Sequence, residues 1–113
     1  MSISALGSGL SGLRSFQTAL DSTANNVANI DTPGYQPEKA NFQNASNGGV
    51  SVVVNTPNAS QAANTTNAGS APSGTDYATE AVNSLQYQFG FDMSAQVIKA
   101  ADHNLGTLID LTA

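Results

Sequence analysis

The residues that could support catalysis are few, and their spacing does not suit it. The chain has no cysteine and a single histidine, His103, which directly follows Asp102. Adjacent residues on a helix do not face each other, so this pair does not form an acid–base dyad. A lone histidine without cysteine or a second histidine is also a poor metal site. We therefore predict no catalytic residue, no metal and no cofactor.

Two other patterns have the letters of a binding site without its context. Residues 7–12 read G-S-G-L-S-G, which fits a phosphate-binding glycine loop. That loop needs a preceding β-strand, and only residues 1–6 precede it here. Acidic side chains are spread along the C-terminal third, at Asp76, Glu80, Asp92, Asp102 and Asp110. This spread is typical of a solvated helix face rather than of a cation site.

The composition argues against several partner classes. The net charge is −5, and the 113 residues include only three cations, Arg14, Lys39 and Lys99. We therefore expect no nucleic-acid partner and no binding to acidic membrane surfaces. No apolar run approaches the ~20 residues of a membrane span, and the N-terminus lacks the features of a cleaved signal peptide. A charged fraction of 10% instead suits packing against other copies of the chain.

The N-terminal third has the apolar spacing of an amphipathic helix. Apolar residues recur at steps of three, four or seven positions along one helical stripe, and Phe16 lies beside it. The residues of the stripe are Ile3, Leu6, Leu10, Leu13, Leu20, Ala24 and Val27. About 28 helical residues would span roughly 40 Å. Gly7, Gly9 and Gly12 weaken the start of this helix, because each costs about 1 kcal/mol relative to alanine.

A sharp stop follows this helix. Residues 24–35 read A-N-N-V-A-N-I-D-T-P-G-Y, and Pro33 forces Thr32 out of the helical region. Pro33 and Gly34 suit the two central positions of a type II turn, which predicts a positive φ at Gly34. Asn29 could cap the helix or contact a neighbouring subunit. We give capping at least equal weight, because asparagine tolerates the left-handed conformation.

The remaining chain divides into a polar middle and a second helix. Residues 36–75 are rich in asparagine, and within them residues 50–54 form the clear strand candidate, with residues 39–42 as its partner in a small hairpin. Residues 58–74 carry almost no large apolar side chain and suggest a linker or surface loop. The second helix begins at Thr75 or Asp76, and its apolar stripe extends to Leu111.

These elements predict a mainly α fold. Two long terminal helices pair as an antiparallel coiled-coil hairpin, and the short middle holds at most a small β-hairpin. The expected divisions are residues 1–35, 36–75 and 76–113. A two-helix core is thin, so self-association would complete it. The side chains expected to pack the helices and mediate assembly are Leu6, Leu10, Leu13, Leu20, Val27, Val82, Leu85, Phe89, Val97, Leu105 and Leu108.

The two ends together resemble the bacterial flagellar axial proteins of the rod and hook. The resemblance covers about two thirds of the chain and is carried by S-G-L-S-G-L-R at residues 8–14, the run at residues 24–35, and the C-terminal stretches at 78–83, 88–91 and 99–111. Residues 88–91 depart from the family pattern, with glycine and aromatics where alanine, arginine and tyrosine are usual. The short middle makes the chain nearest in size to a proximal rod subunit.

The resemblance implies a structural subunit of the flagellar basal-body rod or a related axial structure. Its partners would be further copies of the chain, other rod or hook proteins and the flagellar export apparatus. It would lie in the periplasm-spanning rod, exported without a cleaved signal peptide. The turn and intersubunit motif would comprise Asn25, Asn26, Asn29, Thr32, Pro33, Gly34 and Tyr35.

One alternative function remains open at this point. The chain could be a non-polymerising adaptor or regulator that binds a flagellar axial or export protein through the same helical hairpin. Secretion by cells with an active export apparatus separates the two hypotheses, because an adaptor would stay in the cytoplasm.

Overall fold

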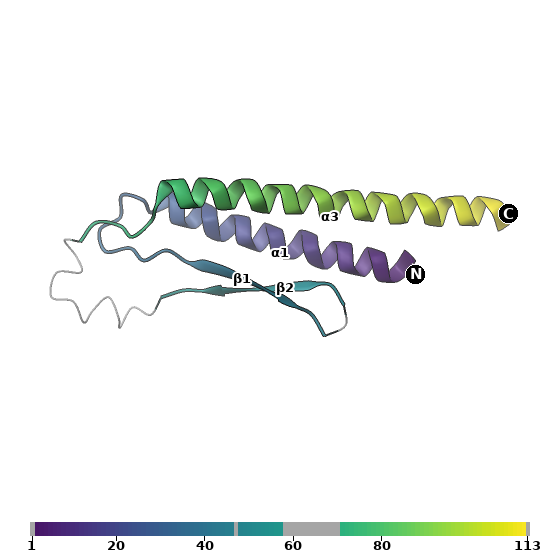
Figure 1. The fold of residues 1–113 in the computed structure, drawn as a ribbon, viewed down its shortest axis with the longest axis horizontal. Helices are drawn as coiled ribbons and strands as arrows, with labels where there is room; N and C mark the ends of the chain where they lie inside the picture. The colour runs from purple at the N-terminus through teal and green to yellow at the C-terminus, as the bar shows by residue number, and fades with distance from the viewer. Residues whose placement is uncertain (1, 47, 58–70, 113) are drawn as a thin grey trace.

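Two long helices form where the apolar spacing predicts them. The computed structural model describes residues 2–46, 48–57 and 71–112. Helix α1 covers Ser2–Ala28 and helix α3 covers Tyr77–Thr112. They lie side by side and run in opposite directions, so both ends of the chain lie at the same end of the molecule (Figure 1). The prediction of a mainly α fold with two long helices is confirmed.

Asp76 determines where α3 begins. Its Oδ1 accepts a hydrogen bond from the Ala78 amide at 3.2 Å, and its Oδ2 accepts one from the Thr79 hydroxyl at 2.8 Å. A carboxylate in this position satisfies an amide that has no partner within the helix and suits the helix dipole. The predicted start at Thr75 or Asp76 is therefore confirmed, with Asp76 as the N-cap residue.

Small side chains, rather than large ones, form the contact between α1 and α3. Gly9, Gly12, Ala19, Thr23 and Asn26 of α1 are buried, at steps of three, four or seven residues. A Cβ atom at Gly9 would lie 2.6 Å from Cγ1 of Ile98, so the backbone of α1 comes close to the α3 side chains. Among the described residues, the only buried hydrophobic side chains are Ala19 and Ala101.

The expected apolar seam is therefore not what joins the two helices within one chain. On α3, Val82, Leu85, Phe89, Val97 and Leu108 are 46–68% exposed. On α1, Leu10 is 43% exposed. The remaining seam residues have intermediate exposure, and they are Leu6, Leu13, Leu20 and Val27 of α1 and Leu105 of α3. The physical reason is that each helix has a second set of residues at seven-residue intervals, beside the apolar stripe. These residues include glycine, alanine and serine, which allow the two helices to approach each other more closely. Whether the pairing is a coiled coil stays a prediction.

The two helices keep one register along their contact. Gly9 lies against Ile98, Gly12 against Ser94, and Phe16 against Gly90, while Asn26 bonds to Glu80. The residue numbers of each facing pair add to 106 or 107. Because α1 starts at Ser2, the last eight residues of α3 extend beyond it, by roughly 12 Å (Figure 1).

A small hairpin lies along α1, as predicted. Strand β1, Lys39–Asn44, pairs antiparallel with β2, Val50–Asn55. The Val50 amide donates to Ser11 Oγ and its carbonyl accepts from Ser15 Oγ, both at 3.1 Å, so serines of α1 hold the start of β2. Phe42 of β1 packs against Phe16 of α1 and Tyr87 of α3, with ring centroids 5.0 and 5.6 Å apart.

The chain leaves the helices and returns to them at one place. The Gly34 amide donates to the Ala71 carbonyl at 2.7 Å, and the Gly74 amide donates to the Tyr35 carbonyl at 2.8 Å. We call residues 34–37 and 71–74 the neck. The expected linker or loop at residues 58–74 lies largely outside the described residues, which resume at 71.

Candidate functional site: the polar junction at the end of α1

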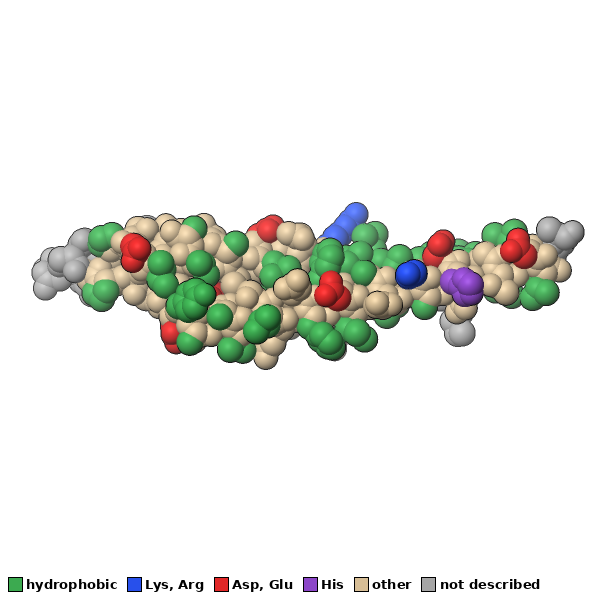
Figure 2. All heavy atoms as spheres, turned by 90° about the horizontal axis from the view of Figure 1, so that it is seen from above, with side chains coloured by type: hydrophobic (Ala, Val, Ile, Leu, Met, Phe, Trp, Pro, Cys, Tyr) green, Lys and Arg blue, Asp and Glu red, His purple; other side chains and the backbone are tan. Residues whose placement is uncertain are grey.

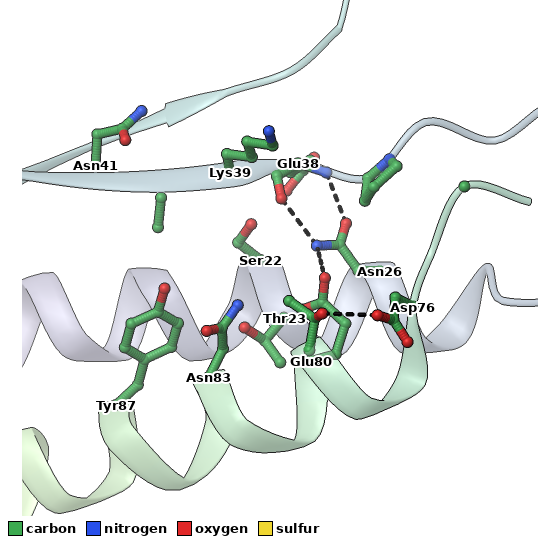
Figure 3. Close-up of a pocket in the computed structure, with 14 residues that line it drawn as sticks. Ser22, Thr23, Asn26, Glu38, Lys39, Asn41, Asp76, Glu80, Asn83 and Tyr87 are labelled. Atoms are coloured by element: carbon green, nitrogen blue, oxygen red, sulfur yellow. Dashed lines mark hydrogen bonds between the residues drawn. The ribbon is translucent and has the colours of Figure 1, made fainter.

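Asn26 is the centre of a buried hydrogen-bond cluster. Its side chain is 1% exposed. Its Oδ1 accepts from the Tyr35 hydroxyl at 2.8 Å and from the Glu38 amide at 2.7 Å. Its Nδ2 donates to the Glu38 carbonyl and to Glu80 Oε1, both at 2.9 Å. We call Asn26, Tyr35, Glu38 and Glu80 the Asn26 cluster; Figure 3 shows Asn26 between Glu38 and Glu80. One amide thus joins α1, the neck and α3.

The turn before the neck has the predicted geometry. The Tyr35 amide donates to the Thr32 carbonyl at 3.2 Å, which closes a four-residue turn with Pro33 and Gly34 at its centre. Gly34 has φ of +73°, as a type II turn requires at that position. The prediction of positive φ at Gly34 is therefore confirmed. The turn brings the Tyr35 hydroxyl back onto α1.

The neighbouring asparagines have local roles. Asn29 Nδ2 donates to the Asn25 carbonyl at 2.9 Å, and Asn29 Oδ1 accepts from the Thr32 hydroxyl at 3.0 Å. Asn29 therefore caps α1 through its side chain, and not by the left-handed conformation, because no described non-glycine residue has positive φ. Asn25 is exposed and donates to the Tyr35 hydroxyl and to Glu38 Oε1, at 3.0 and 3.3 Å.

Intersubunit hydrogen bonds from Asn26 stay a prediction, and in the single chain this side chain is already fully hydrogen-bonded. Its carbonyl oxygen and its amide each have two partners within the chain. A side-chain amide offers two donor hydrogens and two acceptor lone pairs, so no capacity remains. Of the other asparagines in this motif, Asn25 is exposed and Asn29 is partly exposed, and a contact with neighbouring subunits remains a prediction for both.

A polar cleft of about 380 Å³ opens beside the Asn26 cluster. It lies between β1, the first turns of α3 and the end of α1 (Figure 3). Glu80 lines it and is only 5% exposed. The residues that line the cleft are Ser22, Thr23, Asn26, Pro37, Glu38, Lys39, Ala40, Asn41, Gly74, Asp76, Thr79, Glu80, Asn83 and Tyr87.

Burial and negative charge at the junction act on two tyrosines. Burial raises the pKa of the Tyr87 hydroxyl above 10.0, and the Glu80 carboxylate raises it further. Burial likewise raises the pKa of Tyr35, with added contributions from the charges of Glu38 and Glu80, while its hydrogen bond with Asn25 acts in the opposite direction. Both phenols are therefore held in their neutral form, in which the Tyr35 hydroxyl can donate to Asn26.

Sequence reasoning missed most of the residues that build this junction. Glu80 was expected on a solvated helix face, which is wrong because it is 5% exposed, and Glu38, Ser22 and Thr23 had no expected role. A usable signal was present, because Ala5, Gly12, Ala19 and Asn26 recur at seven-residue intervals, as do Glu80, Tyr87, Ser94 and Ala101. Read as a contact frame, these rows place one polar residue of each helix at the same end.

Two helices meet through small residues, one polar cluster joins them, and large apolar side chains remain on the outside. In the described ranges, no group of three His, Cys, Asp or Glu side chains could hold a metal ion. Within the same residues, neither helix combines the length and apolar character that crossing a bilayer requires.

Comparison with known proteins gives the family. The family model described as flagella basal body rod protein matches residues 6–36, which hold α1 and the turn. The model described as flagellar basal body rod FlgEFG protein C-terminal matches residues 72–111, which hold α3 and part of the neck. The chain belongs to the flagellar rod protein family, which is structural and not enzymatic, so the expectations of this family and of a non-enzymatic protein are confirmed.

One curated relative shares a short stretch of sequence. The flagellar basal-body rod protein FlgG of Bacillus subtilis (strain 168) is 44% identical to this chain over 36 residues. Those residues make up 32% of this chain and 14% of the relative. The similarity thus covers a small part of the relative.

Proposed function

We propose that this chain is a structural subunit of the bacterial flagellar basal-body rod or a related axial structure, and that it self-assembles through its two terminal helices. Its partners are further copies of itself and other rod or hook proteins, and the flagellar export apparatus delivers it to the periplasm-spanning rod. In this proposal residues 1–35 and 76–113 form the packed helical part, and residues 36–75 form a separate polar middle.

The observation that carries the proposal is that each helix exposes its large apolar side chains. The face of α3 that carries Val82, Leu85, Phe89, Met93 and Val97 is 46–68% exposed at these positions. Figure 2 views the molecule from the side of α3 and shows hydrophobic side chains recurring along its length, with scattered charges between them. An extended apolar surface of this kind marks a contact with other chains.

The two exposed faces differ from each other, which favours an open assembly. The outer face of α1 carries Ile3 and Leu10, at 81% and 43% exposure, whereas the outer face of α3 carries the larger row described above. A contact between two different surfaces is heterologous, and such contacts build rings or helical filaments rather than closed dimers. A tubular structure such as a rod requires contacts of this kind.

Sedimentation of the full chain over a concentration series tests this proposal. The wild type should self-associate, and Leu85→Asp should remain monomeric, because the new carboxylate would have to be desolvated at the contact. Leu85 is 68% exposed in the single chain, so the variant should unfold within about 1 kcal/mol of the wild type.

Gln86→Asp is the matched control. It adds the same charge at the next position, which is exposed but outside the apolar row. This control should associate like the wild type. A wild type that stays monomeric at millimolar concentration and gains no order with rod proteins would overturn the proposal, and retention in the cytoplasm would favour the adaptor function.

A further inference from the structure

The cleft beside the Asn26 cluster is lined by hydroxyl groups that have no partner within the described chain. Ser22 and Thr23 are each 5% exposed and line the cleft. Neither hydroxyl has a hydrogen-bond partner among residues 2–46, 48–57 and 71–112. Figure 3 shows the Ser22 hydroxyl directed from α1 toward the space below β1. Thr75 Oγ1 is the one fully buried side-chain oxygen or nitrogen without a partner in the described chain, so the Ser22 and Thr23 hydroxyls open onto the cleft. A ligand with donors and acceptors would suit this space.

Glu80 adds spare acceptor capacity on the opposite wall. Its carboxylate is almost fully buried, yet Asn26 Nδ2 is its only hydrogen-bond donor among the described residues. A carboxylate has about four acceptor positions. Removing such an anion from water is costly unless a cation or several donors compensate it. Glu80 thus has acceptor positions that no described residue fills at the side of an open cleft.

The charges around the cleft are mainly negative. Glu38 and Asp76 line it together with Glu80, and Lys39 is the one cation among its lining residues. In Figure 3 the Lys39 amine points away from Asn26 and Glu80, so it does not compensate them. The rise in the pKa of the Tyr87 hydroxyl, caused first by burial and then by Glu80, agrees with a negative field inside the cleft.

We propose that this cleft binds a guanidinium group, which an arginine of a neighbouring protein chain supplies in an assembly. A guanidinium offers five donors in a planar fork, enough to pair with the Glu80 carboxylate while also donating to the two hydroxyls. An ammonium offers three donors from a single point and matches this spread of acceptors less well.

The chain cannot supply this group to its own cleft. Its one arginine, Arg14, lies twelve residues before Asn26 on the same helix, which places the two roughly 18 Å apart along the axis. A neighbouring chain must therefore provide the arginine, either as Arg14 of a second copy or as a residue of another protein. The neighbour as source rests on the proposed function, whereas guanidinium binding itself does not.

N-acetylarginine amide, titrated into the full chain at a concentration where it is monomeric, tests the binding. The side-chain amide resonances of Asn41 and Asn83, which line the cleft, should shift in a saturable manner in ¹⁵N–¹H NMR spectra. N-acetylcitrulline amide has nearly the same shape without the charge. It should bind at least about tenfold more weakly, because a charge-assisted pair is replaced by a neutral one.

Three variants identify the residues responsible. Glu80→Gln keeps an oxygen that can accept from Asn26 and removes the charge, so it should weaken binding about tenfold. Thr23→Val keeps the shape of the side chain and removes a hydroxyl that bonds to no described residue, so the variant should fold normally. It should weaken binding by about threefold or more. Asp102→Asn removes an acidic charge of α3 outside the cleft and should leave binding unchanged.

The proposal is overturned if the two ligands give equal shifts, if Thr23→Val and Glu80→Gln bind like the wild type, or if no saturable shift occurs. In the last case the cleft holds water only. The source is then separated by Arg14→Gln, which should weaken self-association if a second copy provides the group and leave it unchanged if another protein does. Absence of self-association in the wild type would refute the proposed function alone, because the titration uses the monomer.

Discussion

At the scale of single residues, the stability of the junction depends on Asn26 more than on any other asparagine of its motif. Its four hydrogen bonds reach Tyr35 and Glu38 after the turn and Glu80 of α3. Asn25 is adjacent and chemically identical, but it is exposed and makes two longer bonds. The same residue type thus contributes differently at two consecutive positions because only one faces the partner helix.

Replacement of Asn26 should therefore be costly, and replacement of Asn25 should not. Asn26→Ala leaves the Tyr35 hydroxyl, the Glu38 amide and the Glu80 carboxylate without their partner, so the free energy of unfolding should fall by about 2–4 kcal/mol. Asn25→Ala, the matched control, should cost below about 1 kcal/mol. Urea titrations followed by circular dichroism measure both. An equal decrease in the free energy of unfolding in the two variants would show that the buried hydrogen bonds of Asn26 do not stabilise the chain more than the exposed ones of Asn25.

The two junction tyrosines predict a loss of stability at alkaline pH. Burial raises the pKa of Tyr35 and Tyr87 in the folded chain above 10.0. Below pH 10 both states hold the proton, and the stabilising contribution is complete. As the pH rises through the raised pKa, the unfolded chain has already ionised, so this contribution is lost.

Unfolding midpoints between about pH 8 and pH 11 measure this effect. The double variant Tyr35→Phe with Tyr87→Phe should lose less stability over this range than the wild type. Tyr77→Phe is the control, because it removes the hydroxyl of a tyrosine that is 64% exposed and lies outside the junction. An alkaline slope that is unchanged in the double variant would exclude the two tyrosines as its cause.

At the scale of elements, the helix pair depends on the absence of side chains. A Cβ atom at Gly90 would collide with the ring of Phe16, which itself packs against Phe42. Glycine usually destabilises a helix interior by about 1 kcal/mol relative to alanine. Here the close approach of the two helices gives Gly90 a packing role that offsets this cost.

Alanine scanning of the glycines should therefore give opposite signs on one helix. Gly90→Ala should lower the free energy of unfolding by about 1–3 kcal/mol, because the Phe16 ring must move within its packed cluster. Gly106→Ala should raise it by about 0.5–1 kcal/mol, because a Cβ there meets no atom within 4 Å. Thermal unfolding of both variants decides this, and a gain in stability for Gly90→Ala would refute the close contact.

At the scale of the whole molecule, the chain is long and thin and carries little charge. Its extents are 71 × 26 × 15 Å, and its net charge of −5 comes with only three cations. A molecule of this shape has too little interior to bury its large apolar side chains. Association through apolar faces is therefore the expected means of covering them.

Self-association should accordingly depend weakly on ionic strength. Between about 0.05 and 0.5 M sodium chloride, the association constant should change by less than about tenfold, because few charges lie at the apolar faces. Sodium sulfate should strengthen association, since it favours apolar burial. Sedimentation velocity at fixed protein concentration measures both. A steep loss of association with sodium chloride would indicate an electrostatic interface instead.

The sequence predicted the elements well and their packing poorly. The helix that ends before Pro33, the glycine at positive φ, the hairpin and the start of α3 at Asp76 all follow from local chemistry. The face through which the helices pack does not follow from local chemistry, because each helix has two sets of residues at heptad spacing that could form it. Hydrophobicity predicts that the helices pack through the residues that include Leu10 and Leu85. Within the single chain they pack through the residues that include Gly12 and Ser94, because these small side chains permit close contact.

The junction was hidden for a related reason. Asn26 and Glu80 are 54 positions apart, and their pairing depends on the register of the two helices. No local pattern distinguishes a buried asparagine from an exposed one in a run that contains several. The register itself became visible only through the close contacts of Gly9, Gly12 and Gly90 with the opposite helix.

The neck has a consequence for how much sequence the middle can hold. Two backbone hydrogen bonds, Gly34 to Ala71 and Gly74 to Tyr35, bring the outgoing and returning segments together beside the helices. The two ends of the middle are therefore held together at the helices, apart from the contacts that its hairpin makes with α1 through Ser11 and Ser15. Lengthening such a loop adds only a slowly growing entropic cost. The chain between the two neck segments is thus a place where a protein of this architecture can carry a larger or a smaller domain. Its helices would keep their register in either case.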